Sequence, residues 1–481
     1  SEIQSLNRQE DAAERDEKEL GYSTWSAEIA AYGVSDRVAA LRDNLRTAEE
    51  MCASAPRGLT GGNAHELPMF DLTGGLHLAP STGVPIWASQ SDLFSERVGD
   101  KVLTTLDQLA GMSEAEARAW IAAHPEFDDA ALAAPPPADE VATWWFEQGA
   151  SADLASAGQL ALIAVAPAVV GSMEGVGYWA RDRSNRAVLD KAIEDERARL
   201  EDAQPRARVR LNHDKLDNLL EIQASLDPGD NDQIRQLTSL DLRGRPIAAV
   251  SVGDLDAASH VAYQVSGMFS STSGMTGAVS DAQRLYSEQA TVAGRLGRTD
   301  PMATVAWIGY DSPDAVSVVF DDKAEAGAEQ LSMALTGSNA VGAVQGRDNY
   351  LAVDAHSYGT TVSMIALRED LGVDAFAMYG SAGGVDIKDV RELDVPTGEV
   401  YATETRNDPW APVGRFLSDR SDPLSDRFGA SEFRSDGGVP DPYGGEFIEI
   451  SGHSEYLHAR SESLRNLALI NLGRGDLVTK D

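Results

Sequence analysis

The chain has 481 residues, more than a single hydrophobic core usually holds, so at least two regions are expected. Its formal net charge is -37, and such an acidic surface repels nucleic-acid backbones and anionic membranes. The single cysteine, Cys52, excludes an internal disulfide and a thiolate metal cluster. The longest apolar run, residues 160–171, is too short to cross a bilayer, so no transmembrane segment is expected.

The cellular compartment stays open on these properties. A large domain needs no disulfide outside the cell, so the cysteine count does not decide the question. The chain begins with Ser1 rather than Met, which is compatible with the removal of a leader or a tag. We expect a soluble protein that is either cytoplasmic or secreted.

The first half of the chain predicts helices. Residues 38–45 have an amphipathic pattern, and residues 58–92 are rich in Gly, Pro, Ser and Thr. Ser113, followed by two glutamates within three residues, is typical of a helix start. Further helical patterns cover residues 103–109, 189–203 and 212–226. We therefore expect a large all-α N-terminal region over residues 1–240.

The pattern changes near residue 240, where short apolar runs begin to alternate with helical patterns. Strands are expected at residues 247–252, 261–265, 303–308, 350–353, 375–379, 398–403 and 446–450. Helices are expected at residues 278–296, 324–335, 360–369, 387–393 and 454–472. This alternation predicts an α/β domain over residues 241–481, with a mostly parallel sheet covered on both faces.

The most informative stretch is residues 351–359, which read Leu-Ala-Val-Asp-Ala-His-Ser-Tyr-Gly. An apolar strand pattern ends in this motif and a helical pattern follows it. This is the layout of a nucleophile elbow, a tight turn that lifts a serine above the edge of the sheet. The positions two before and two after the serine must be small, and Ala355 and Gly359 meet that requirement. Ser357 is therefore the predicted nucleophile.

A serine hydroxyl needs a base, and the base needs an orienting acid. In this layout the acid and then the histidine follow the serine along the chain. Of the eight histidines, only His453 and His458 lie beyond Ser357 with room for an acid between. His453 follows an expected strand, whereas His458 falls one turn into the expected last helix. His453 is the predicted base, and His458 is the alternative.

The loop after the expected strand 398–403 should supply the acid. It carries Glu404 and, just before Pro409, Asp408. A short carboxylate on a loop stiffened by proline can hold an imidazole in one orientation, so Asp408 is the predicted acid. Glu404 is the alternative, and a simple turn before Pro409 is the other use that the sequence suggests for Asp408.

An oxyanion site needs two backbone N–H donors. Tyr358, directly after the nucleophile, should supply one of them. The second is expected in the turn after the strand 261–265, where Gly267 lets the backbone approach the substrate and Met268, or alternatively Phe269, donates. Phe269 follows in the same turn, and we expect it to line the substrate pocket together with Gly267.

Other residues complete the expected pocket. Tyr310 and Asp311 end the strand before the elbow strand and are expected to contact the substrate. His356 lies next to the nucleophile, where adjacent side chains on a tight turn point apart, so it is expected to be a packing or turn residue. No stretch matches a phosphate loop, a dinucleotide fingerprint or a zinc spacing, so neither a cofactor nor a metal is expected.

With these motifs, the chain resembles an actinobacterial α/β-hydrolase family that was originally described as a domain of unknown function. The shared blocks are residues 144–145, 170–176, 181–186, 252–254, 260–261, 265–268, 307–313, 355–359, 407–409, 428–430 and 452–456. The resemblance covers about residues 140–470 and implies an α/β-hydrolase fold with Ser357, Asp408 and His453 as its triad. The chain departs from the family at Ala355, where Gly is usual, and at Ser266, where Pro is commoner.

The expected function is hydrolysis of carboxylic esters by a serine hydrolase that forms an acyl-enzyme. Two alternatives stay open: a peptidase or amidase with the same triad, and a binding or secretion-associated protein in which the helical region is the working part. The expected partner is a small ester or amide substrate. No nucleic acid is expected to bind. Three roles remain open for the N-terminal helices, which are capping the active site, homo-oligomerisation and binding of another protein.

Overall fold

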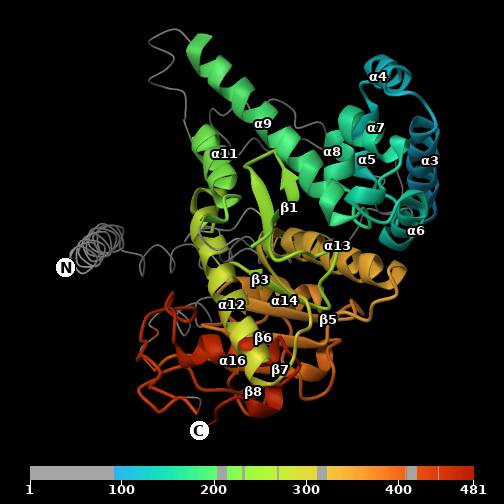
Figure 1. Cartoon of the computed structure of the whole chain (residues 1–481). Helices are drawn as coiled ribbons and strands as arrows, with labels where there is room; N and C mark the ends of the chain where they lie inside the picture. Colours follow the sequence, from blue (N-terminus) through green and yellow to red (C-terminus); the bar gives the residue numbers. More distant parts are fainter. Residues whose placement is uncertain are drawn as a thin grey trace, which may run out of the picture. The chain divides into compact units, whose positions relative to one another are not determined.

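The computed structural model describes residues 92–202, 214–229, 233–267, 270–310, 322–406, 408, 420–442 and 444–480 (Figure 1). These residues belong to a unit that begins at Pro85. The helix expected at residues 38–45 and Cys52 lie outside the described residues. The division into regions 1–240 and 241–481 stays a prediction.

Helices make up the described chain before residue 226, as the sequence predicts. They are α3 (Asp92–Ala110), α4 (Glu114–Ala123), α5 (Phe127–Ala133), α6 (Ala138–Gln148), α7 (Ala157–Val165), α8 (Pro167–Ser172), α9 (Tyr178–Asp202) and α11 (Asp214–Ser225). Ser113 begins α4 as expected, because its hydroxyl accepts from the Glu116 N–H while the Glu116 carboxylate accepts from the Ser113 N–H. In the described part of the chain, none of the helices combines the length and apolar character needed to cross a membrane.

The second half of the chain forms one eight-stranded sheet. Its strands are β1 (Arg235–Asp241), β2 (Ile247–Val252), β3 (His260–Val265), β4 (Met302–Ile308), β5 (Tyr350–His356), β6 (Ala375–Tyr379), β7 (Val400–Thr403) and β8 (Ser431–Glu432). Their order is β1-β2-β4-β3-β5-β6-β7-β8. The ladders β1–β2 and β2–β4 are antiparallel, and every ladder from β4 to β8 is parallel. The predicted mostly parallel sheet is therefore confirmed.

Helices cover both faces of the sheet. On one face, α13 (Asp322–Val344) and α14 (Gly359–Ala366) pack on a core that includes Val353 of β5. On the other, α12 (Met275–Arg295) and α16 (Glu462–Ile470) pack on a core that includes Ala352. Burial on both sides explains why the central strands read as continuous apolar runs rather than as an alternating pattern.

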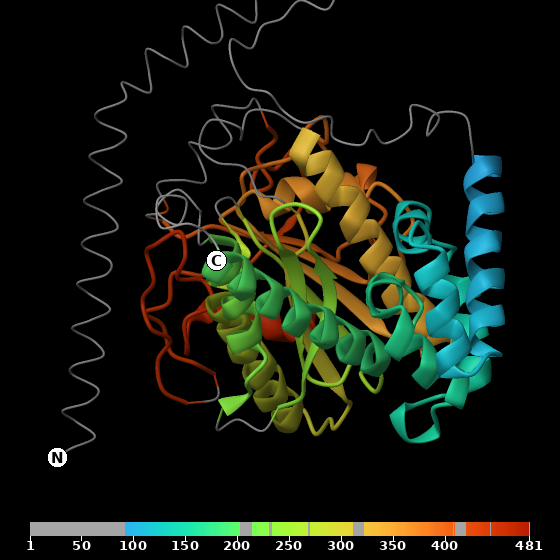
Figure 2. The same cartoon turned by 90° about the horizontal axis from the view of Figure 1, so that it is seen from above.

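Helices α3 to α8 group at one side of the sheet (Figures 1 and 2). From that group α9 extends along β1, and the carboxylate of Asp256, in the loop after β2, accepts the N–H groups of Tyr178 and Trp179 at the start of α9. Helix starts carry unsatisfied N–H donors, so this carboxylate ties the helical region to the sheet domain.

Several elements differ from those predicted from the sequence. Residues 446–450 form only isolated bridges instead of a strand, and the last helix begins at Glu462 instead of residue 454. Ser461 caps that helix through the Leu464 N–H, so the residues before it are free to form turns. The helix expected at residues 387–393 is a short 3₁₀ turn, Val390–Glu392. Strands β1 and β8 were not predicted.

A buried ion pair lies where the helical region meets α13. Arg181, in α9, donates to both carboxylate oxygens of Glu174, and its side chain is 2% exposed. A Cβ at Gly337, in α13, would lie almost on the Glu174 carboxylate, so the pair packs directly against that helix. Each charge depends on the other for its stabilisation, because little water reaches either of them.

Replacing Arg181 with Met should destabilise the fold by about 3–5 kcal/mol, because it leaves the buried Glu174 without its cation. The measurement is the free energy of unfolding in urea. Arg118→Met removes an exposed partner of Glu114 and should change that free energy little. Equal losses in the two variants would contradict a special role for the buried pair.

Candidate active site

The predicted elbow forms at the carboxyl edge of the sheet, where β5 ends at His356 and α14 begins at Gly359. Ser357, between them, has φ +53°, a left-handed conformation that non-glycine residues rarely adopt. Two hydrogen bonds hold it there: its N–H donates to the carbonyl of Tyr379 at 3.2 Å, and its own carbonyl accepts from the Ala382 N–H at 3.1 Å. Strain held in place by the surrounding backbone is typical of functional turns.

Small residues around Ser357 are required by close packing. A Cβ at Gly359 would lie 2.4 Å from the carbonyl oxygen of Val265, and a Cβ at Gly267 would lie 2.7 Å from the Cβ of Ser357. Ala355, where the related family has Gly, is fully buried in the core beneath α14. The methyl group of Ala355 is therefore accommodated, and the elbow keeps its geometry.

The expected acid and base lie together. His453 Nδ1 is 2.8 Å from Asp408 Oδ2 and 2.9 Å from Oδ1. The Asp408 side chain is fully buried, whereas that of His453 is 18% exposed. A carboxylate at Nδ1 favours the tautomer with the proton on that nitrogen, so Nε2 is the atom left to act as a base.

Gly380 places this pair beside the elbow. It follows Tyr379, whose carbonyl holds the Ser357 N–H, and it has φ +56°. A Cβ at Gly380 would lie 3.0 Å from Asp408 Oδ2 and 3.2 Å from His453 Cε1. The structure thus brings Ser357, Asp408 and His453 to one edge of the sheet, although they come from distant parts of the chain.

Among the described residues, the structure does not pair the alternative base, His458, or the alternative acid, Glu404, in the way that it pairs His453 with Asp408. His458 lies in a turn before α16, with its N–H bonded to the Glu455 carbonyl, and not in the helix where it was expected. The described contacts pair Asp408 with His453 rather than with His458, and His453 with Asp408 rather than with Glu404.

His356 contacts the base loop, which the sequence did not predict. Its Nε2 lies 2.7 Å from the carbonyl oxygen of His453 and must therefore carry the donated proton. The rings of His356 and His453 are 4.6 Å apart. Burial, and then the neighbouring His453, lower the pKa of His356 to about 3, so its ring is neutral at neutral pH. His356 is the packing residue expected, with an added hydrogen bond that joins the elbow to the base loop.

The oxyanion side is described only in part. Tyr358 is buried at the start of α14, and Gly267, after β3, lies against Ser357. Met268 and Phe269, expected in the same turn, and Asp311, expected in the substrate pocket, lie outside the described residues. The roles of all five stay predictions.

The Tyr310 side chain contacts the loop that follows β3. Its side chain is buried, and its hydroxyl donates to the carbonyl of Ser266 at 2.7 Å, just before Gly267. Its ring also stacks on that of Tyr358, 6.3 Å away. Tyr310 therefore supports the loop that starts the expected oxyanion site, and its contact with a substrate stays a prediction.

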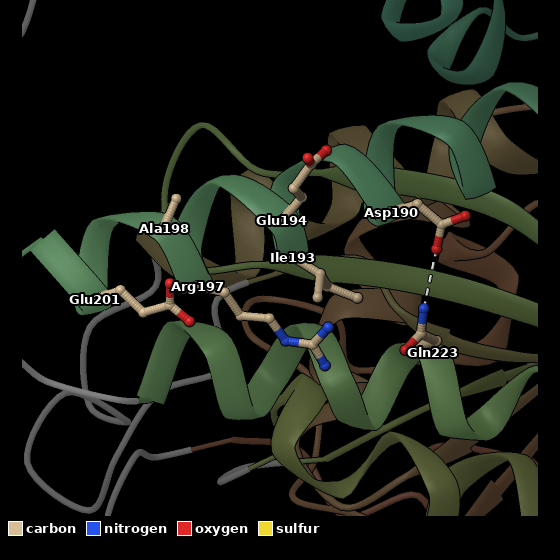
Figure 3. Close-up of a pocket in the computed structure, with 7 residues that line it drawn as sticks. All are labelled: Asp190, Ile193, Glu194, Arg197, Ala198, Glu201 and Gln223. Carbon is tan, nitrogen blue, oxygen red and sulfur yellow. Dashed lines mark hydrogen bonds between the residues drawn. The ribbon is translucent and has the colours of Figure 1, made fainter.

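A groove of about 380 Å³ lies elsewhere, between α9 and α11 (Figure 3). It is lined by Asp190, Ile193, Glu194, Arg197, Ala198, Glu201 and Gln223. Gln223 donates to Asp190 across it at 2.9 Å. None of these residues belongs to the elbow or to the loops that carry Asp408 and His453. In the described part of the chain, no group of three or more His, Cys, Asp and Glu side chains is arranged to hold a metal.

Comparisons with known proteins agree with this architecture. The family model described as "Alpha/beta hydrolase" matches residues 241–417. Uncharacterized protein Mb0988c of Mycobacterium bovis is 30% identical over 196 residues, which cover 39% of this chain and 73% of that protein. Uncharacterized protein Rv2079 of Mycobacterium tuberculosis is 26% identical over 399 residues, which cover 72% of this chain and 58% of that protein. The chain thus matches little more than half the length of Rv2079.

Among solved structures, a hyperthermophilic esterase from Pyrobaculum calidifontis aligns with a TM-score of 0.30 at 14% identity, covering 60% of this chain and 97% of that one. The low TM-score means that this alignment adds nothing to the identification. The family match, the Mycobacterium bovis relative and the parallel sheet with its elbow identify the family instead. The chain belongs to the α/β-hydrolase family.

Proposed function

We propose that this hydrolase is a serine esterase, with Ser357 as nucleophile, His453 as base and Asp408 as orienting acid. One observation carries the proposal: a serine in a left-handed turn at the sheet edge lies beside a buried carboxylate paired with a histidine. A turn with a purely structural role would need neither the strained backbone of Ser357 nor the buried pair of Asp408 and His453. The mycobacterial relatives support the resemblance to an actinobacterial branch of the family.

The proposed reaction has two halves. In the first, His453 Nε2 takes the proton of the Ser357 hydroxyl as its oxygen attacks the ester carbonyl. The resulting oxyanion accepts hydrogen bonds from the backbone N–H groups of Tyr358 and Met268. The C–O bond to the alcohol then breaks, and the alcohol leaves with the proton from His453.

In the second half, a water molecule replaces the alcohol. His453 takes a proton from the water, whose oxygen attacks the acyl-enzyme carbonyl. Collapse of this intermediate releases the carboxylic acid and returns the proton to Ser357. Asp408 keeps the His453 Nδ1 proton in place throughout and stabilises the imidazolium while it exists.

A serine-directed fluorophosphonate tests the nucleophile directly. The wild-type protein should form an adduct that mass spectrometry places on Ser357, and Ser357→Ala should form none. Ser280→Ala, which removes an exposed serine hydroxyl on α12, should label like the wild type. Labelling that persists in Ser357→Ala would reject the assignment, and an unlabelled wild-type protein would favour a binding protein instead.

Esters and amides pass through the same kind of intermediate, so these residues would serve a peptidase or amidase as well. Rates on matched ester and amide substrates with the same acyl group decide between them. For an esterase, the ester should react faster than the amide by a larger factor than the difference in intrinsic reactivity between the two bonds would give.

A further inference from the structure

Tyr456 lies behind the acid and base. It follows His453 by three residues, and its side chain is about 1% exposed. Its ring packs on those of Tyr379 and His356, with centroids 5.5 Å and 6.1 Å away. A phenol so enclosed needs partners for its hydroxyl, because an unsatisfied buried hydroxyl is costly.

The Tyr456 hydroxyl has two partners on the turn that carries the acid. It lies 3.1 Å from the backbone nitrogen of Thr405 and 2.8 Å from Asp408 Oδ2. An N–H can only donate, so the hydroxyl accepts from Thr405 and gives its own proton to the carboxylate. The Asp408 N–H also donates to the Thr405 carbonyl at 3.1 Å, so the hydroxyl bridges both ends of a closed turn.

This arrangement restricts how Asp408 can rotate. The terminal torsion of an aspartate is broad, so a carboxylate held by one partner alone can swing. Here Oδ2 receives the Tyr456 proton, and both carboxylate oxygens face His453 Nδ1. Burial and the charge of Asp408 raise the pKa of Tyr456 far above its usual range, so the hydroxyl stays a donor at any working pH.

We propose that Tyr456 is a positioning residue of the active site, whose hydroxyl orients the Asp408 carboxylate and, through it, the ring of His453. This inference depends on the proposed function, because it assigns Tyr456 a role in the same reaction. Tyr456 touches no reacting atom. It acts by orienting Asp408, which in turn orients His453.

Tyr456→Phe tests the inference, because it keeps the ring and removes only the hydroxyl. The kcat for a p-nitrophenyl ester should fall about 10- to 100-fold, the range of one hydrogen bond to a charged group, with KM nearly unchanged. The acid limb of the pH profile of kcat/KM should also move to higher pH. Without the phenol proton, the Asp408 charge holds a proton on His453 more strongly, and the protonated ring cannot act as a base.

Tyr401→Phe is the matched control. The Tyr401 side chain is also buried, and its hydroxyl donates to Glu399 Oε2 at 2.8 Å near the start of β7, away from the elbow. The control removes the same kind of bond and should keep the wild-type kcat and pH profile. An equal fall in both variants would show a general loss of stability rather than positioning.

Two results would overturn the inference. One is a Tyr456→Phe protein with the wild-type kcat and pH profile. The other is a fall in kcat that follows a loss of thermal stability while the acid limb stays in place, since packing alone would produce that. If Ser357→Ala keeps its turnover or its fluorophosphonate labelling, the proposed function itself fails. An inactive Ser357→Ala beside a fully active Tyr456→Phe rejects the positioning role alone.

Discussion

Replacing Ser357 with Ala should lower the turnover of short p-nitrophenyl esters by a factor of about 10⁴ to 10⁶ and leave the fold intact. The substitution removes the oxygen that attacks the carbonyl. It creates no new clash, because alanine is smaller than serine, and it keeps the two hydrogen bonds of the backbone N–H and carbonyl of residue 357 that hold the turn. The measurement is kcat under saturating substrate, with circular dichroism to check the fold.

The Ser280→Ala variant serves as the control for this loss as well. Residual activity in Ser357→Ala at more than a few per cent of the wild type would mean that another group attacks the ester. In that case the strained turn at Ser357 would have to be explained without catalysis.

Asp408→Asn should lower kcat by about 10⁴-fold while the protein keeps its structure. An asparagine amide can donate to His453 Nδ1, which draws the ring proton to Nε2 and leaves the base with no lone pair toward Ser357. It also removes the negative charge that stabilises the imidazolium. The fall in kcat should be seen with both short and long esters, because it concerns the reacting groups and not the pocket.

Asp476→Asn is a suitable control, since Asp476 is an exposed partner of Arg474 near the end of the chain. Glu404→Gln tests the rival acid from the same loop. A large loss in Glu404→Gln combined with normal activity in Asp408→Asn would transfer the acid role to Glu404 and contradict the role proposed for the Asp408–His453 pair.

The central strands could be predicted because burial on both faces leaves a signal in the local sequence. Strand β1 gave no such signal, since Arg235, Gln236 and Thr238 are polar yet buried. Their environment comes from distant residues: Arg186 of α9 donates to the Arg235 carbonyl, and the Gln236 side chain accepts from the Leu255 N–H. A local pattern cannot show contacts of this kind.

The candidate site, like the fold, has a part that the local sequence predicts and a part that depends on distant residues. The elbow at Ser357 is a local motif, and chain order narrows the base to two histidines. The choice of His453 assumed a strand at residues 446–450, which is only bridged. What places His453 is instead a turn in which the Glu455 carboxylate accepts the N–H groups of Ser451 and Gly452. The contacts of Tyr456 with Asp408 and of His356 with the base loop join residues far apart in sequence, so no spacing rule could find them.

The proposed base is the last of the three groups along the chain, and His453 lies 97 positions after His356 of the elbow. Chains are synthesised from the N-terminus, and their earlier parts begin to fold first. On the proposed assignment, a nascent chain exposed as far as Asp408 has a nucleophile and an acid but no proton acceptor. On that assignment, hydrolysis can begin only after the residues that follow Asp408 have folded and α16 has packed against the sheet.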